Sequence, residues 1–232
     1  MAWGLFASLG VINVLFMVQG RTGYMILLVL LVWFAWATLA RGIQKRGRLC
    51  GWKQGVAVVL LFSGLSIAAY HSSTRLQERL YLVVSEFQEW QPNHRTETST
   101  GLRLDFYYNT LQIVQQHPVF GMGTGGFAAA YIAQTAGTEL IQTTNPHNEY
   151  LMVAVQVGMV GLAMLLYLFY SLWRYAPQLG TPLEQDAARG LVLAYLVNSM
   201  FNSALHDHAD GLLFAFMAAV LFAGLKRKGV NE

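Results

Sequence analysis

The residues best suited to chemistry here are a histidine and an asparagine after a proline, in the run Asn145-Pro146-His147-Asn148. Asparagine as N-cap followed by proline is typical of a helix start, so we expect a helix from residue 146. His147 and Asn148 would then lie in its first turn, where unpaired N–H groups and the helix dipole favour an anion such as phosphate. That position would lower the pKa of His147, which suits a neutral imidazole acting as a base or hydrogen-bond acceptor. A histidine that only satisfies the helix end is the alternative.

Two arginines are notable, and the residues alone make Arg21 a candidate for binding such an anion. Arg21 lies in a predicted short turn, Gln19–Gly23, and Arg103 opens a helical pattern two residues before Asp105. Arginine suits a diphosphate because its planar fork makes bidentate contacts. Each arginine also has a simpler interpretation. Arg21 could contact lipid phosphates at the interface, and the residues alone favour a surface ion pair of Arg103 with Asp105, worth roughly 0–1 kcal/mol.

A glycine-rich run, Gly121-Met-Gly123-Thr-Gly125-Gly126, contains a literal G-x-G-x-x-G. No βαβ pattern surrounds it and no Lys-Ser/Thr pair follows, so neither a dinucleotide site nor a P-loop is indicated. We interpret it as a tight turn that brings the backbone close to a neighbour or a ligand.

A second polar cluster, His206-Asp207-His208-Ala-Asp210, contains residue types that bind metals. Its spacing matches no strong metal signature, and we predict a solvated turn and no metal site. The lone Cys50 excludes a multi-cysteine centre and an intrachain disulfide framework. Asn198, Asn202 and His206 are spaced by four, which predicts one helix face directed to a bundle interior or a wet cavity.

The elements that must position these residues are set by an apolar composition. The 232 residues are 55% hydrophobic and 12% charged, against about 25% charged in a typical soluble domain, and the mean hydropathy is +0.40. This indicates a membrane protein and excludes a disordered chain. Six apolar stretches approach the length of a membrane span, at about residues 2–18, 24–40, 55–70, 149–173, 190–205 and 211–225.

The basic residues predict the orientation of these spans. The loop 41–54 and the tail at 226–228 are rich in Lys and Arg, which keeps short loops in the cytoplasm. The alternation then places ten of the fifteen basic residues inside and all six histidines outside. The pI near 9.0 is therefore explained by topology, without a nucleic-acid partner. We expect three N-terminal helices in 1–70, a periplasmic subdomain in 71–148, and three C-terminal helices in 149–232.

The outer segment 71–148 has its own helical patterns. Apolar residues at helical spacing predict an amphipathic helix over 76–90, lying on the membrane or capping the bundle. Further helices are expected over 102–116 and 127–136. In the next expected span, 149–173, the small residues Ala154 and Gly158 share one helix face. They predict a seam at which a neighbouring helix packs closely.

Three motifs in order resemble the O-antigen ligase family. The first is Gln19-Gly20-Arg21-Thr22, similar to the family's S-R-T/G turn with Gly in place of Ser. The second is Arg103, followed about fifteen residues later by His117-Pro118-Val-Phe-Gly121-Met-Gly123. The third is His147-Asn148, nine residues, then Gly158-Met-Val-Gly161, similar to H-N-x9-G-x-x-G. The resemblance covers nearly the whole chain, and it looks like the C-terminal half of a member.

The resemblance implies an all-α, polytopic helix bundle of about six transmembrane helices with a GT-C-like fold. It implies transfer of a glycan from undecaprenyl diphosphate to lipid A–core, on the periplasmic face of the bacterial inner membrane, with inversion. No metal, nucleotide or other cofactor is expected, because the lipid diphosphate is already an activated leaving group. Carried over by residue, Arg21 and Arg103 would bind the diphosphate, His147 would orient or deprotonate the acceptor hydroxyl, and Asn148 would support it. The other residues expected to support the site are Gly121, Gly123, Asn202 and His206.

Other functions share these features. An O-antigen or capsule polymerase and a protein O-oligosaccharyltransferase have the same motifs and differ in the acceptor. A transporter or lipid-binding membrane protein without catalysis is the alternative from another class. A transporter is expected to have interrupted helices and polar groups near mid-membrane. The notable residues here instead gather at the outer interface, and only Asn198 and Asn202 are expected to lie deep.

Overall fold

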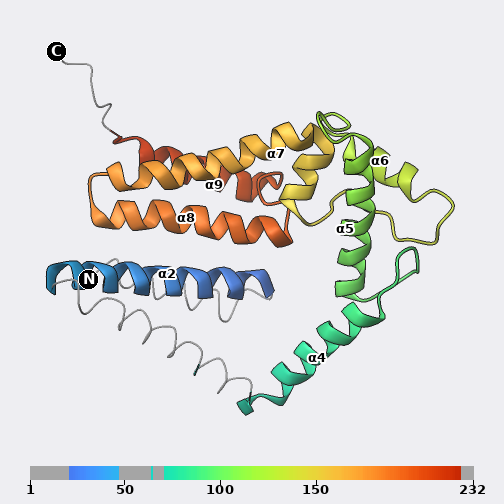
Figure 1. Ribbon diagram of the computed structural model, residues 1–232, viewed down its shortest axis with the longest axis horizontal. Helices are drawn as coiled ribbons and strands as arrows, with labels where there is room; N and C mark the ends of the chain where they lie inside the picture. Colours follow the sequence, from blue (N-terminus) through green and yellow to red (C-terminus); the bar gives the residue numbers. More distant parts are fainter. Residues whose placement is uncertain (1–20, 47–63, 65–70, 226–232) are drawn as a thin grey trace. The chain divides into compact units, whose positions relative to one another are not determined.

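The computed structural model describes residues 21–46, 64 and 71–225. Every element in these ranges is a helix, which agrees with the predicted all-α class (Figure 1). In chain order they are α2 (Arg21–Arg46), α4 (Thr74–Glu89), α5 (Ser99–Gln116), α6 (Phe127–Gln134), α7 (Glu149–Tyr175), η2 (Ala176–Gln178), α8 (Pro182–Phe201) and α9 (His208–Phe222).

Two of the described helices are long and apolar enough to cross a membrane, Thr22–Arg41 and Glu149–Gln178. Only 6% of the first and 39% of the second is buried, whereas a core helix of a soluble protein is mostly buried. The helix α9 is apolar but has 15 residues. The expected span 2–18 lies outside the described residues, as does the span 55–70 apart from residue 64.

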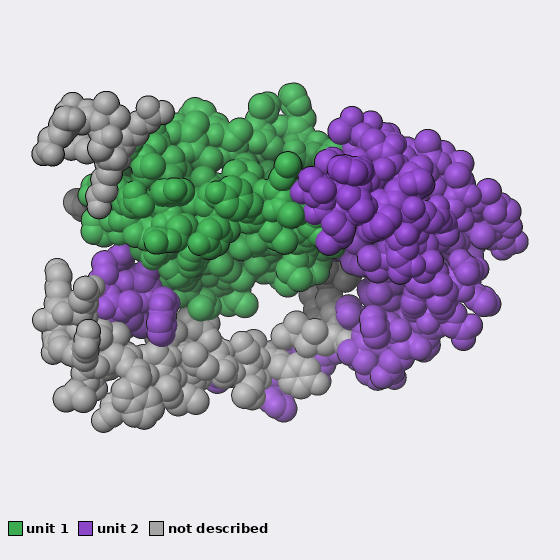
Figure 2. Space-filling view, turned by 45° about the horizontal axis from the view of Figure 1, so that its top comes forward, with its two compact units in different colours: residues 1–35, 148–150, 161–232 green, residues 36–147, 151–160 purple. Residues whose placement is uncertain are grey.

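The chain divides into two compact units (Figure 2). Unit 1 comprises residues 1–35, 148–150 and 161–232, and unit 2 comprises residues 36–147 and 151–160. The division 1–70, 71–148 and 149–232 expected from the sequence concerns sides of a membrane, not contacts within the chain, and it remains a prediction.

In unit 1, α8 packs between α9 and α2 through small and aromatic residues. Gly190 of α8 lies against Leu30 and Phe34 of α2. The Tyr195 ring meets Phe214 of α9 at a centroid distance of 4.7 Å. The helix α8 starts with a capping box, in which Thr181 and Glu184 each bind the other's backbone N–H. It ends at Phe201, four residues before the end of the predicted span 190–205.

In unit 2, α5 and α6 form a core with the start of α7. Its buried members are Phe106, Ile113, Phe127, Ala130, Tyr131, Met152 and Val155. The N-cap Thr98 accepts a hydrogen bond from the N–H of Gly101 at 3.1 Å, which stabilises the start of α5 by about 1 kcal/mol. The helices expected over 76–90, 102–116 and 127–136 are thus confirmed as α4, α5 and α6, with ends shifted by at most three residues.

Candidate functional site

Helix α7 is broken at Gly158, whose backbone has φ 71° and ψ −168°. This conformation lies in a region that is essentially restricted to glycine. The sequence predicted a helix–helix seam at Ala154 and Gly158, and this prediction is wrong at Gly158. The neighbour that approaches Gly158 is the segment 118–120, not another helix.

The glycine-rich turn supplies the hydrogen bonds that the broken helix loses. The N–H groups of Met122 and Gly123 donate to the carbonyls of Val155 and Gln156, at 2.7 and 2.9 Å. In the reverse direction, the N–H of Met159 donates to the carbonyl of Pro118 at 2.8 Å. Buried or membrane-embedded backbone groups need such partners. The turn and the kink therefore form one structural piece within unit 2.

Two glycines permit this close approach. A Cβ on Gly158 would overlap the carbonyl of Val119, and a Cβ on Gly121 would overlap the carbonyl of Val155. Gly121 also has a φ of +69°. The interpretation of the glycine-rich run as a tight turn against a neighbour is confirmed, and that neighbour is the kink of α7.

His147 lies just outside α7 instead of in its first turn. The helix begins at Glu149, so the predicted start at residue 146 is wrong. The N–H of His147 donates to the Oδ1 of Asn145 at 2.7 Å, and His147 takes a left-handed φ of 54°. Asn145 therefore closes a local turn, because its side chain binds the backbone two residues on.

One face of α5 packs against His147. Its ring stacks on Phe106, with centroids 6.1 Å apart and an interplanar angle of 28°, and the Tyr107 hydroxyl donates to its carbonyl at 3.2 Å. Arg103 precedes these two by three and four residues, which places it on the same helix face. Burial lowers the pKa of His147, and the positive charge of Arg103 lowers it further. The predicted direction is confirmed, but its causes are burial and Arg103.

Asp105 faces away from this group. It is 2% exposed, and its Oδ1 accepts a hydrogen bond from the Trp90 indole N–H at 2.8 Å. Burial raises the pKa of Asp105, against the lowering effect of the Trp90 hydrogen bond. Residues two apart on a helix do not share a face. The interpretation of Asp105 as the surface partner of Arg103 is therefore wrong, because Asp105 is buried.

In unit 1, the start of α7 meets the turn between α8 and α9. The Asn148 amide donates to the carbonyl of Met200 at 3.2 Å. Glu149, 1% exposed, accepts from the N–H groups of Leu205 and His206 at 2.9 and 3.3 Å, and its Oε1 lies 3.3 Å from the Nδ1 of His206. Sequence reasoning missed Glu149, although an acidic residue in the first turn of a helix was a usable signal.

The predicted helix face of Asn198, Asn202 and His206 is only partly correct. The Asn202 amide does donate to the Oδ1 of Asn198 at 2.8 Å. Asn202, however, is the extended C-cap of α8, so His206 lies beyond the helix and turns to Glu149. Asp207 caps α9 by accepting from the N–H groups of Ala209 and Asp210. Within the described ranges, no group of three or more His, Cys, Asp or Glu residues could hold a metal ion.

Arg21 is the first residue of α2 in the described part of the chain, and its side chain lies outside the described residues. Residues 21–23 are helical, so the expected turn Gln19–Gly23 is wrong over its second half.

A family model for O-antigen ligase matches residues 6–166, more than two thirds of the chain. The chain belongs to the O-antigen ligase family. A relative in Haemophilus influenzae, an uncharacterized protein, is 24% identical over 174 residues. The match covers 71% of this chain and 44% of the relative, so the chain spans about half the length of that protein.

The segment matched to O-antigen ligase contains the kink of α7 at Gly158, the glycine-rich turn and the α5 face. It also contains Arg21, Arg103, His147 and Asn148. The turn with Asn202 and His206 lies beyond it. Members of this family are membrane proteins, which agrees with the two long apolar helices.

Proposed function

We propose that this chain is a ligase-type membrane glycosyltransferase, which moves a glycan from undecaprenyl diphosphate to lipid A–core in lipopolysaccharide synthesis. Family membership supports the general class. The surroundings of His147 carry the specific proposal, because a half-buried histidine close to an arginine stays neutral and can accept a proton.

His147 is proposed as the base. The acceptor hydroxyl attacks the anomeric carbon of the donor sugar and gives its proton to the neutral imidazole. The stacked Phe106 ring and the Tyr107 hydroxyl restrict the position of His147, which favours a well-defined hydrogen bond to the acceptor. A single displacement needs no covalent enzyme intermediate, so inversion at the anomeric carbon follows.

Arg103 is proposed to bind the leaving group. As the bond between the anomeric carbon and the phosphate oxygen breaks, the electron pair goes to that oxygen, and undecaprenyl diphosphate leaves. A fixed guanidinium stabilises this developing charge more than water does. Arg21 is proposed as the second diphosphate ligand. Because the lipid diphosphate is already activated, we propose a reaction without a metal or nucleotide cofactor.

The remaining residues are proposed to position the site. Asn148 is proposed to support the acceptor beside His147. The next residue, Glu149, binds the backbone of the turn that contains His206 and so holds that turn against the start of α7. Gly121 and Gly123 keep the 118–126 turn locked on the kink of α7. Asn202 anchors the start of the same α8–α9 turn through Asn198.

We further propose six transmembrane helices in a GT-C-like arrangement in the bacterial inner membrane, with His147 on the periplasmic face. The large apolar exposure of α2 and α7 supports a lipid environment. The basic segment 41–54 supports the cytoplasmic assignment of that loop.

Replacing His147 with Ala tests the role of the base. In cells that carry the full chain, His147→Ala should abolish O-antigen on lipid A–core at unchanged protein level, as measured by gel electrophoresis of lipopolysaccharide. His208→Ala, at an exposed histidine of α9, is the matched control and should retain transfer. Normal lipopolysaccharide in His147→Ala would refute the catalytic role.

Replacing Arg103 with Lys tests the diphosphate role. A lysine keeps the charge but lacks the planar fork, so we expect transfer to drop by about tenfold or more. Arg174→Lys, at an exposed arginine near the end of α7, should leave transfer unchanged. The same assay with polysaccharide chain length and protein glycosylation as readouts tells which acceptor is used. Full activity of Arg103→Lys would contradict a bidentate contact.

A further inference from the structure

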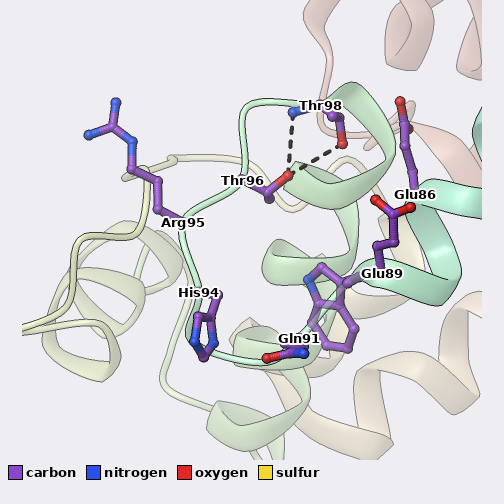
Figure 3. Close-up of a pocket in the computed structure, with 8 residues that line it drawn as sticks. Glu86, Glu89, Gln91, His94, Arg95, Thr96 and Thr98 are labelled. Carbon is purple, nitrogen blue, oxygen red and sulfur yellow. Dashed lines mark hydrogen bonds between the residues drawn. The ribbon is translucent and has the colours of Figure 1, made fainter.

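A separate cavity of about 260 Å³ lies where α4 ends and the chain turns toward α5 (Figure 3). It belongs to unit 2, and neither His147 nor Arg103 lines it. Its lining combines the Trp90 and His94 rings with the side chains of Glu86, Glu89, Gln91, Arg95, Thr96 and Thr98.

Trp90 is held in a fixed orientation. Its indole N–H is used by the buried Asp105 at 2.8 Å, and its ring meets Tyr108 edge-on at a centroid distance of 5.8 Å. Because the polar atom of the ring is already bound, the part of Trp90 that lines the cavity is apolar ring surface. A rigid aromatic surface of this kind contributes contact area at low entropic cost.

Carboxylates outnumber guanidinium groups in the lining of the cavity, with Glu86 and Glu89 against Arg95. Figure 3 shows Glu86 and Glu89 on the same side, while Arg95 points away from the other labelled residues. Arg95 is also paired with Glu97 at 3.1 Å. The two carboxylates and the Gln91 amide offer several acceptors and donors for hydroxyl groups. The two carboxylates disfavour a diphosphate or an acidic sugar here, because like charges repel.

We propose that this cavity binds one uncharged or amine-bearing pyranose ring of a glycan. A pyranose has an apolar face of C–H groups for Trp90 and a rim of hydroxyls for the polar residues. The volume lies just below the roughly 300 Å³ at which sites for drug-sized ligands begin, so it suits a single ring. The proposal depends on the proposed function only in that glycan transfer would bring the saccharide to the protein. It adds a binding subsite apart from the reacting groups.

The test uses the full chain in detergent micelles, with glucosamine, glucose and glucuronic acid as probes. Saturation-transfer NMR should show binding of glucosamine and glucose and at least tenfold weaker binding of glucuronic acid. Trp90→Ala should weaken the binding of glucosamine and of glucose by about tenfold. Phe87→Ala, at an exposed aromatic residue of α4 outside the cavity, is the matched control and should bind as the unaltered chain does.

Two further variants separate binding from folding and from catalysis. Trp90→Phe loses the bond to Asp105 but keeps a ring, so it should bind more tightly than Trp90→Ala. His147→Ala should bind all three sugars normally, whether or not transfer survives, so a failure of the proposed reaction does not affect this test. No binding of glucose or glucosamine, or equal binding by Trp90→Ala and the unaltered chain, would overturn the proposal, as would preferred binding of glucuronic acid.

Discussion

The protonation of His147 is determined by its neighbours on α5 and not by a helix end. Burial against Phe106 removes solvent from the imidazolium, and Arg103 adds a like charge. Both effects oppose protonation, so His147 gains its proton below the ordinary pKa of about 6.5. At neutral pH the imidazole is therefore neutral, the state that a base requires.

Removing the positive charge of Arg103 should raise the pKa of His147. In a histidine-labelled sample, NMR titration of Arg103→Gln should place the His147 midpoint higher than in the unaltered chain. The midpoint should still lie below that of a free histidine, because burial remains the larger cause. Arg95→Gln is the control and should leave the midpoint in place. An unchanged midpoint in Arg103→Gln would contradict the electrostatic contact.

The protonation of His147 should also make the free energy of unfolding depend on pH, with lower stability at lower pH. The unfolded chain protonates His147 near pH 6.5, before the folded chain does, because the folded pKa is lower. This contribution to the free energy of unfolding is thus fully present above about pH 6.5 and is lost as the pH falls through the folded pKa.

At the scale of elements, the kink of α7 and the turn 118–126 depend on each other. A helix break leaves carbonyl and N–H groups without partners, which is costly away from water. Here the turn donates to Val155 and Gln156 and accepts from Met159, so the break is satisfied by one neighbouring segment. The segment carrying Pro118 and Gly121 is thereby held on the helix that follows His147.

Replacing Gly158 with Ala should destabilise this piece strongly. The conformation itself costs of order 1–3 kcal/mol for an alanine, and the new Cβ also overlaps the carbonyl of Val119. Gly137→Ala is the matched control, since Gly137 has a φ of +77° with nothing within 4 Å of an added Cβ. Thermal unfolding in detergent should show a clearly larger loss for Gly158→Ala. Equal losses would mean that the close approach to Val119 is unimportant.

At the scale of the whole molecule, the long apolar helices α2 and α7 expose many large apolar side chains. Large side chains such as Leu28 and Trp36 of α2 and Met164 and Tyr167 of α7 are more than two fifths exposed. Lipid is the environment in which such exposure is stable. The orientation in that lipid rests on the distribution of Lys and Arg, which the predicted topology places mainly inside.

The single cysteine provides a direct test of this topology. In intact cells, a membrane-impermeant thiol reagent that reaches the periplasm should not label Cys50, which the positive-inside rule places in the cytoplasm. The double variant Cys50→Ser/Glu139→Cys should be labelled, since Glu139 is exposed in the outer segment. Labelling both sites with a permeant reagent confirms that each is reactive. Labelling of Cys50 by the impermeant reagent would reverse the assigned orientation.

The sequence by itself determined the helical class, the long apolar helices and the family. Apolar runs and helical periodicity are local properties, so α4, α5, α6 and the apolar part of α7 could be read within a few residues. The motif spacing around Arg103, His147 and Gly158 was likewise visible without coordinates, and the family comparison agrees with it. The direction of the His147 pKa was also predictable.

Only the tertiary structure decided how these residues are used. Asn145 could cap a helix or close a local turn, and the choice depended on where His147 packs against α5. Gly158 could line a helix seam or break the helix, and the partner segment 118–123 decided for the break. Glu149 and Asp105 became buried hydrogen-bond acceptors through residues 15 to 57 positions away. Periodicity reports the neighbours along one helix, whereas these outcomes depend on long-range contacts.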